Sequence, residues 1–266
     1  MAATELPLNE ARVRRCARPI RTGSGETAVL GLHGFMGYPG ELAYPASRLA
    51  DAGFTVSVPR MPGHGTCGED FDNSTGDQWL RCAVDHYLEL RSRYRDVHLM
   101  GHSMGGILSL ILASRFPVKK MVLMAPAVQV AYPLGMSVPA SWFVRKVLNK
   151  PAWKADPSIR FRDDRDPDDD EFLGGEYWTW SNFRRLADLH RLKVRSVRGM
   201  KKVNSSILTI MGQDDPTVPT GAAQLIRKRT SGEVRTVILE KNAHLIPYER
   251  DYKKTGDLTV DWLLRS

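Results

Sequence analysis

The sequence predicts an α/β fold in which helices flank a mainly parallel central sheet. Two observations carry this prediction: short apolar runs rich in β-branched residues recur along the chain, and segments with an amphipathic helical pattern separate most of them. A third observation adds an inserted segment, because no strand-like run occurs between about residues 128 and 190.

The predicted strands are apolar along nearly their whole length. This pattern is typical of parallel strands that are covered on both faces. In strands with one face in solvent, apolar and polar residues alternate instead. The strands are expected at residues 27–33, 54–60, 97–101, 120–126, 206–212 and 234–240.

The predicted helices carry recognisable end signals. Gly53 is expected to end the first helix, because glycine accepts the left-handed conformation that often follows a helix. Thr75 or Asp77 is expected to cap the second, whose buried face should carry Trp79, Val84, Tyr87 and Leu88. The helices are expected at residues 39–53, 75–94, 105–116, 221–230 and 251–266.

The segment without predicted strands divides the chain into a core and an insertion. Residues 1–127 and 191–266 are predicted to form the core, and residues 128–190 a helical lid, or cap. The insertion contains most of the tryptophans and an acidic stretch, "DDRDPDDDE". Its aromatic content predicts that the insertion covers the binding site of an apolar ligand. The alternative is a small structural subdomain.

Composition excludes several classes of protein. The chain has 266 residues and a formal net charge of +8, but its basic residues are scattered, which favours a role in solubility and predicts no nucleic-acid partner. Three cysteines without a CxxC pair predict neither a disulfide framework nor a zinc site. We expect a cytoplasmic monomer or homodimer without a secretory signal or stable membrane insertion, because no apolar stretch is long enough.

The stretch "GHSMGG" places Ser103 between Gly101 and Gly105, after an apolar strand and before an apolar helix. A serine hydroxyl is a weak nucleophile unless a base lies beside it and the backbone exposes it. A sharp turn between strand and helix provides that exposure, and the close approach of the two backbones requires glycine on either side. The stretch therefore predicts a nucleophile elbow, with a plain glycine-rich turn as the alternative.

Together with four further motifs, this stretch resembles the α/β-hydrolase fold, in particular the carboxylesterase and monoacylglycerol lipase family. The other motifs are "LGLHGFMG", "PRMPGHG", "GQDDPTV" and "NAHLIPYERD". The resemblance extends from about residue 17 to the end of the chain, and the lid matches only in position. It implies a serine hydrolase of carboxylic esters that needs no cofactor or metal.

The resemblance also implies the order nucleophile, acid, histidine along the chain. Only His190 and His244 follow Ser103, and only His244 follows the last predicted strand, so His244 is the expected base. The family spacing of glycine, acid and valine selects Asp215 over its neighbour Asp214.

The oxyanion formed during ester hydrolysis needs preorganised N–H donors. The backbone N–H groups of Met104 and, by resemblance, Phe35 are expected to supply them. Aromatic and apolar residues of the lid are candidate substrate contacts, with internal packing of the lid as the alternative: Met136, Trp142, Phe143, Trp178 and Trp180.

The expected substrate is a small ester with a short-to-medium apolar acyl chain, or a monoacylglycerol. Hydrolysis of another acyl bond (an aryl or feruloyl ester, an amide or a C–C bond) is the alternative in chemistry, because one fold supports many reactions. The alternative to an enzyme is a protein that keeps the hydrolase fold and binds a ligand without catalysis.

Overall fold

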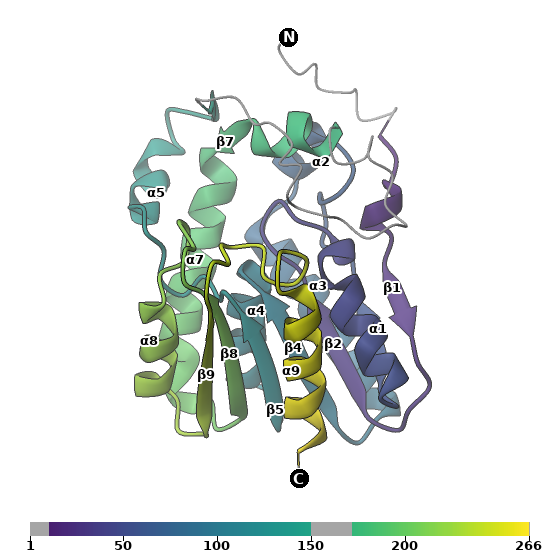
Figure 1. Cartoon of the computed structure of the whole chain (residues 1–266). Helices are drawn as coiled ribbons and strands as arrows, with labels where there is room; N and C mark the ends of the chain where they lie inside the picture. Colours follow the sequence, from purple (N-terminus) through teal and green to yellow (C-terminus); the bar gives the residue numbers. More distant parts are fainter. Residues whose placement is uncertain (1–10, 150–171, 266) are drawn as a thin grey trace.

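The structure is a computed structural model that describes residues 11–149 and 172–265. Among these residues, seven strands form one sheet in the order β1-β3-β2-β4-β5-β8-β9 (Figure 1). β1 is antiparallel to β3, and the other neighbouring pairs are parallel, which confirms the predicted sheet. The strands are β1 (Ile20–Thr22), β2 (Ala28–Leu32), β3 (Thr55–Val58), β4 (Val97–His102), β5 (Lys120–Met124), β8 (Ser206–Gly212) and β9 (Val234–Leu239).

The central strands are buried as their composition predicts. Every residue of β2 and β4 is buried, because helices cover both faces of the sheet there. The six predicted strands correspond to β2, β3, β4, β5, β8 and β9. The edge strand β1 was not predicted, since three residues are too few to show a periodic pattern.

Helices α1 and α9 pack against each other on one face of the sheet, in front of it in Figure 1. Helices α3, α4 and α7 pack together on the other face. The α-helices are α1 (Ala43–Asp51), α2 (Gly68–Asn73), α3 (Gly76–Arg93), α4 (Met104–Ala113), α5 (Ser137–Ala140), α7 (Phe183–Gly199), α8 (Gly221–Arg229) and α9 (Tyr252–Leu264). Short turns of other helix types are η2 (Arg15–Ala17), η3 (Pro39–Leu42), η4 (Leu134–Met136), η5 (Gly174–Trp178, a π-helix) and η6 (Met200–Lys202).

The predicted helix ends are confirmed, and one predicted face is partly wrong. Gly53 follows α1 with φ +88°, and the Thr75 side chain accepts the Gln78 N–H at the start of α3. Leu88 of α3 is 43% exposed rather than buried. Its neighbour Tyr87 is fully buried, and consecutive helical residues point about 100° apart, so Leu88 falls outside the buried stripe.

In the described part of the insertion between β5 and β8, α5 and β7 lie at the upper end of the sheet in Figure 1. The expectation that it contains no strand is wrong: β6 (Lys146–Leu148) pairs antiparallel with β7 (Trp180–Asn182). Strands of three residues are too short for a sequence pattern to reveal. Helix α7 is continuous through residue 190, where the sequence placed the boundary between lid and core. The acidic stretch "DDRDPDDDE" lies outside the described residues.

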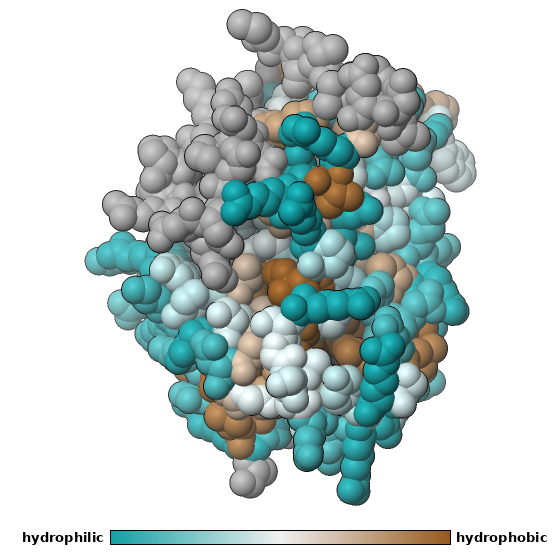
Figure 2. All heavy atoms as spheres, turned by 90° about the vertical axis from the view of Figure 1, so that its right-hand side faces the viewer, coloured by the Kyte–Doolittle hydropathy of each residue, from teal (hydrophilic) through white to brown (hydrophobic). Residues whose placement is uncertain are grey.

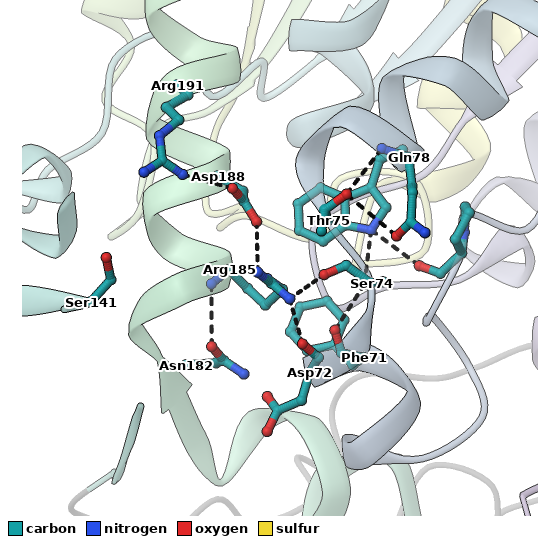
Figure 3. A network of polar contacts seen from close by, with 12 residues as sticks. Phe71, Asp72, Ser74, Thr75, Gln78, Ser141, Asn182, Arg185, Asp188 and Arg191 are labelled. Carbon is teal, nitrogen blue, oxygen red and sulfur yellow. Dashed lines mark hydrogen bonds and ion pairs between the residues drawn. The ribbon is translucent and has the colours of Figure 1, made fainter. Parts of the chain in front are cut away.

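Arg185 of α7 joins this part of the chain to the turn between α2 and α3 (Figure 3). Its buried guanidinium donates to the backbone carbonyls of Asp72 and Ser74 and pairs with Asp188 at 3.0 Å. These acceptors compensate the cost of burying the charge. The base of the insertion is therefore attached to the core by a buried ionic network.

The face at the right of Figure 1 is mostly hydrophilic, with hydrophobic residues scattered over it (Figure 2). Within the described ranges, no helix has the length and apolar character needed to cross a membrane.

Candidate active site

Ser103 occupies a strained turn between β4 and α4. Its φ of +52° and ψ of −110° are rare for a residue with a side chain. A Cβ on Gly105 would lie 1.8 Å from the Leu32 carbonyl oxygen, and one on Gly101 would lie 2.5 Å from the carbonyl of Gly105. Glycine is thus required at both positions by contacts between backbones, as the nucleophile elbow predicts.

We expect Gly105→Ala to destabilise the protein by about 4 kcal/mol or more, because the new methyl group collides with a β2 carbonyl that cannot move without disrupting the sheet. Urea denaturation measures this change. Gly221→Ala at the start of α8 is the matched control, since its methyl group would meet only the Gln129 side chain, at 3.3 Å. Equal stabilities of the two variants would contradict the steric argument.

His244 connects the serine to an acid. Its Nε2 lies 3.0 Å from Ser103 Oγ, and its Nδ1 lies 2.8 Å from Asp215 Oδ2. Asp215 follows β8 and His244 follows β9, so the parallel sheet brings three distant segments together at one edge. The structure therefore places His244 within hydrogen-bonding distance of both Ser103 and Asp215, the two other residues selected from the sequence.

The neighbouring carboxylates Asp214 and Asp215 differ in environment. The Asp215 side chain is buried, and its Oδ1 accepts the N–H groups of Thr217 at 2.7 Å and Val218 at 2.9 Å. Burial by itself raises the pKa of Asp215, but the His244 bond and these N–H groups outweigh it, so the pKa is lowered. Asp214 is exposed. The geometry thus favours Asp215 as the partner of His244.

The two predicted oxyanion donors lie in the segments that follow two neighbouring strands, β4 and β2. Met104 is the first residue of α4, and Phe35 lies in the loop after β2. Neither N–H has a backbone acceptor among the loop hydrogen bonds of the described residues. The Phe35 ring packs edge-to-face against Phe71 and Trp79, which holds this loop on the core.

Comparisons with known proteins agree with this arrangement. The model of the alpha/beta hydrolase family matches residues 29–256. The chain belongs to the alpha/beta hydrolase family. It is 29% identical over 230 residues, which are 86% of each chain, to the thermostable monoacylglycerol lipase of Bacillus sp. (strain H-257). It is 32% identical over 106 residues, 40% of this chain and 43% of the relative, to a carboxylesterase of Bacillus subtilis (strain 168).

Solved structures confirm the alpha/beta hydrolase fold. A structure reported for the metagenome-derived lipolytic enzymes LipS and LipT matches with a TM-score of 0.81 and 22% identity, over 95% of this chain and 99% of that one. The monoacylglycerol lipase of Paleococcus ferrophilus matches with a TM-score of 0.73 and 16% identity, over 92% and 97% of the two chains. At these identities the likeness concerns the fold alone.

The predicted lid contacts of this alpha/beta hydrolase fall into two groups. Met136, Trp142 and Phe143 are 68%, 77% and 87% exposed, and Trp142 lines a surface hollow whose lining does not include Ser103. Trp178 and Trp180 are half-buried. The Trp178 indole donates to the Met36 carbonyl at 3.1 Å, next to the predicted donor Phe35. All five substrate contacts stay predictions.

The remaining histidines near the site make structural contacts. His33 Nε2 accepts the Met61 N–H at 3.0 Å, and the His33 ring packs against the buried His64. His102 is buried and pairs with Glu41, a residue that the sequence did not indicate. A lone glutamate in a predicted helix gives no signal that its side chain is buried. Within the described ranges, no group of three or more His, Cys, Asp or Glu side chains is arranged to hold a metal.

Proposed function

We propose that this protein hydrolyses carboxylic esters through an acyl-enzyme on Ser103. The observation that carries the proposal is the hydrogen-bonded series Asp215–His244–Ser103, with the serine held in a strained turn. Membership of the alpha/beta hydrolase family and the two named relatives support it.

In the proposed first step, His244 Nε2 takes the proton of Ser103 Oγ as that oxygen attacks the ester carbonyl carbon. Asp215 accepts the Nδ1–H of His244 and stabilises the imidazolium that forms. The N–H groups of Phe35 and Met104 are the proposed donors to the oxyanion.

His244 then gives its proton to the leaving alcohol, and the acyl group stays on Ser103. Water enters, loses a proton to His244 and attacks the acyl carbon. The carboxylic acid leaves, and Ser103 regains its proton.

The proposed substrates are esters with short-to-medium apolar acyl chains or monoacylglycerols. The 29% identical relative named monoacylglycerol lipase supports this class. We also propose that residues 128–190 act as a lid over the site, since α5 and β7, described elements of this segment, lie at the end of the sheet from which the loop of Ser103 emerges (Figure 1). The cytoplasmic location and the monomeric or homodimeric state stay predictions.

The proposal is tested with a fluorophosphonate probe and a series of p-nitrophenyl esters of increasing chain length, together with a monoacylglycerol. We expect covalent labelling at Ser103, loss of labelling in Ser103→Ala, and an optimum at short-to-medium chain length. Labelling without hydrolysis of any ester would shift the proposal to an amide, a feruloyl ester or a C–C bond. No labelling of the wild-type protein would favour a ligand-binding homologue.

A further inference from the structure

We propose that Glu41 and His102 form a buried positioning pair that holds two loops of the site in place, the loop carrying Phe35 and the loop carrying His244. This inference rests on the proposed function, because its effect is measured on ester hydrolysis. Neither residue is proposed to touch the substrate.

The pair connects two loops of the site through a series of short contacts. Glu41 Oε2 accepts the Gly34 N–H at 2.9 Å and lies 2.9 Å from His102 Nδ1. His102 Nε2 lies 2.9 Å from the backbone carbonyl oxygen of His244. Gly34 immediately precedes Phe35, and His102 immediately precedes Ser103. The series therefore reaches the residue beside the proposed oxyanion donor, the nucleophile and the backbone of the base.

The turn that carries Phe35 is built around the Glu41 carboxylate. A Cβ on Gly37 would lie 1.9 Å from Glu41 Oε1, and one on Gly34 would lie 3.3 Å from Oε2 and 3.2 Å from His102 Nδ1. The side chains of Glu41 and His102 are only 4% and 2% exposed. Buried charges are costly unless they are paired and hydrogen-bonded, and here the two side chains pair with each other and bond the Gly34 N–H and the His244 carbonyl.

The acceptors around His102 determine its protonation. A carbonyl oxygen only accepts hydrogen bonds, so Nε2 must donate to His244. Nδ1 faces Glu41 Oε2, and because the pKa of Glu41 is lowered this carboxyl is ionised and can only accept, so Nδ1 donates as well. An imidazole that donates through both nitrogens carries a positive charge. The pair is therefore an imidazolium and a carboxylate.

The charged groups around His102 support this protonation state. Burial by itself lowers the pKa of His102, but the negative charge and hydrogen bond of Glu41, the His244 carbonyl and the charge of Asp215 raise it overall. Burial likewise opposes ionisation of Glu41, yet His102, His33 and the Gly34 N–H lower its pKa. His33, which also faces the pair, is buried, and desolvation lowers its pKa. The His244 ring lies 5.2 Å from the His102 ring.

Loss of one proton from His102 breaks the series of hydrogen bonds between Glu41 and the His244 carbonyl. A neutral imidazole has a single N–H, so it cannot donate to Glu41 and to the His244 carbonyl together. Because the pKa of His102 is raised, both contacts are present below that pKa and one is lost as the pH rises through it. We therefore expect activity to decline on the alkaline side through movement of a loop, in addition to any titration of the reacting groups.

The test compares Glu41→Gln with Glu176→Gln. Glu176 is a suitable control because it is also a buried glutamate, and its Oε2 accepts the Gly68 N–H at 2.8 Å. We expect Glu41→Gln to lower kcat about 10- to 100-fold, as a small misplacement of reacting groups does, with KM changed less than about 3-fold. Its alkaline limit should move to lower pH, because the carboxylate that holds the proton on His102 is gone. Glu176→Gln should keep the wild-type pH profile.

A second variant, His102→Gln, tests the inference if Glu41→Gln does not fold. His102→Gln keeps an amide that can donate at this position but does not titrate, so its profile should lack the alkaline decline assigned to His102. Wild-type kcat and pH profile in either folded variant, or the same shift in Glu176→Gln, would overturn the inference. Failure of the proposed function is distinguishable, because then the wild-type protein itself would hydrolyse no ester, whether or not fluorophosphonate labels Ser103.

Discussion

Replacing His244 with alanine is expected to lower kcat about 10⁶-fold, as loss of the base does in serine hydrolases of this design. The imidazole Nε2 lies 3.0 Å from Ser103 Oγ, and without it the hydroxyl has no acceptor for its proton. Turnover of a p-nitrophenyl ester measures the loss. The double variant with Ser103→Ala should lose little more than either single variant, because the residues act as a unit.

His190→Ala is the matched control for this experiment. His190 lies in α7 and follows Ser103 in the chain, as His244 does, but the structure records no contact between it and Ser103 or Asp215 among the described residues. We expect its kcat to stay within about 2-fold of wild type, as for a substitution away from the reacting groups. A large loss in His190→Ala with activity retained in His244→Ala would reverse the assignment of the base.

Asp215→Asn is expected to lower kcat about 10⁴-fold. The asparagine amide cannot hold the imidazole in the tautomer that accepts the serine proton, and it no longer stabilises the imidazolium. The neighbouring Asp214→Asn should change kcat less than about 3-fold, because Asp214 is exposed whereas Asp215 accepts two backbone N–H groups and the His244 ring. The same ester assay measures both variants, with circular dichroism to check folding.

The two aspartates form a matched pair, since each loses one charge at adjacent positions. If Asp214→Asn abolished turnover while Asp215→Asn remained active, the acid would be misassigned. If both kept full activity, His244 would need no carboxylate partner and the proposed mechanism would be wrong.

Features that leave a periodic or local signal were predictable from the sequence. The apolar runs predicted six of the seven strands of the sheet. Gly53 and Thr75 marked helix ends, because the conformation of a glycine and the cap of a threonine affect only adjacent residues. The selection of Ser103, Asp215 and His244 depended on their order and on motifs, and the structure brings the three together. The strand pair β6 and β7 was not predicted, because paired residues that lie 32 to 36 positions apart leave no local pattern.

Glu41 shows a different limit of the sequence. Its position in the predicted helix over residues 39–53 gave no indication that its carboxylate is buried against His102. The pairing depends on how the turn after β2 folds over the end of β4, and only tertiary structure determines that. The exposed positions of Trp142 and Phe143 are similar: aromatic composition predicted an apolar surface but not the direction in which it faces.

The three cysteines make this chain a convenient background for site-specific labelling. Cys16 and Cys67 are buried, and burial raises the pKa of Cys67 and brings that of Cys82 to about 11. Because the thiolate is the reactive form, we expect maleimide reagents to react slowly with all three cysteines at neutral pH. A single cysteine introduced at the exposed position of Phe143 would then carry a fluorophore alone, so movement of the insertion can be followed without first removing the native thiols.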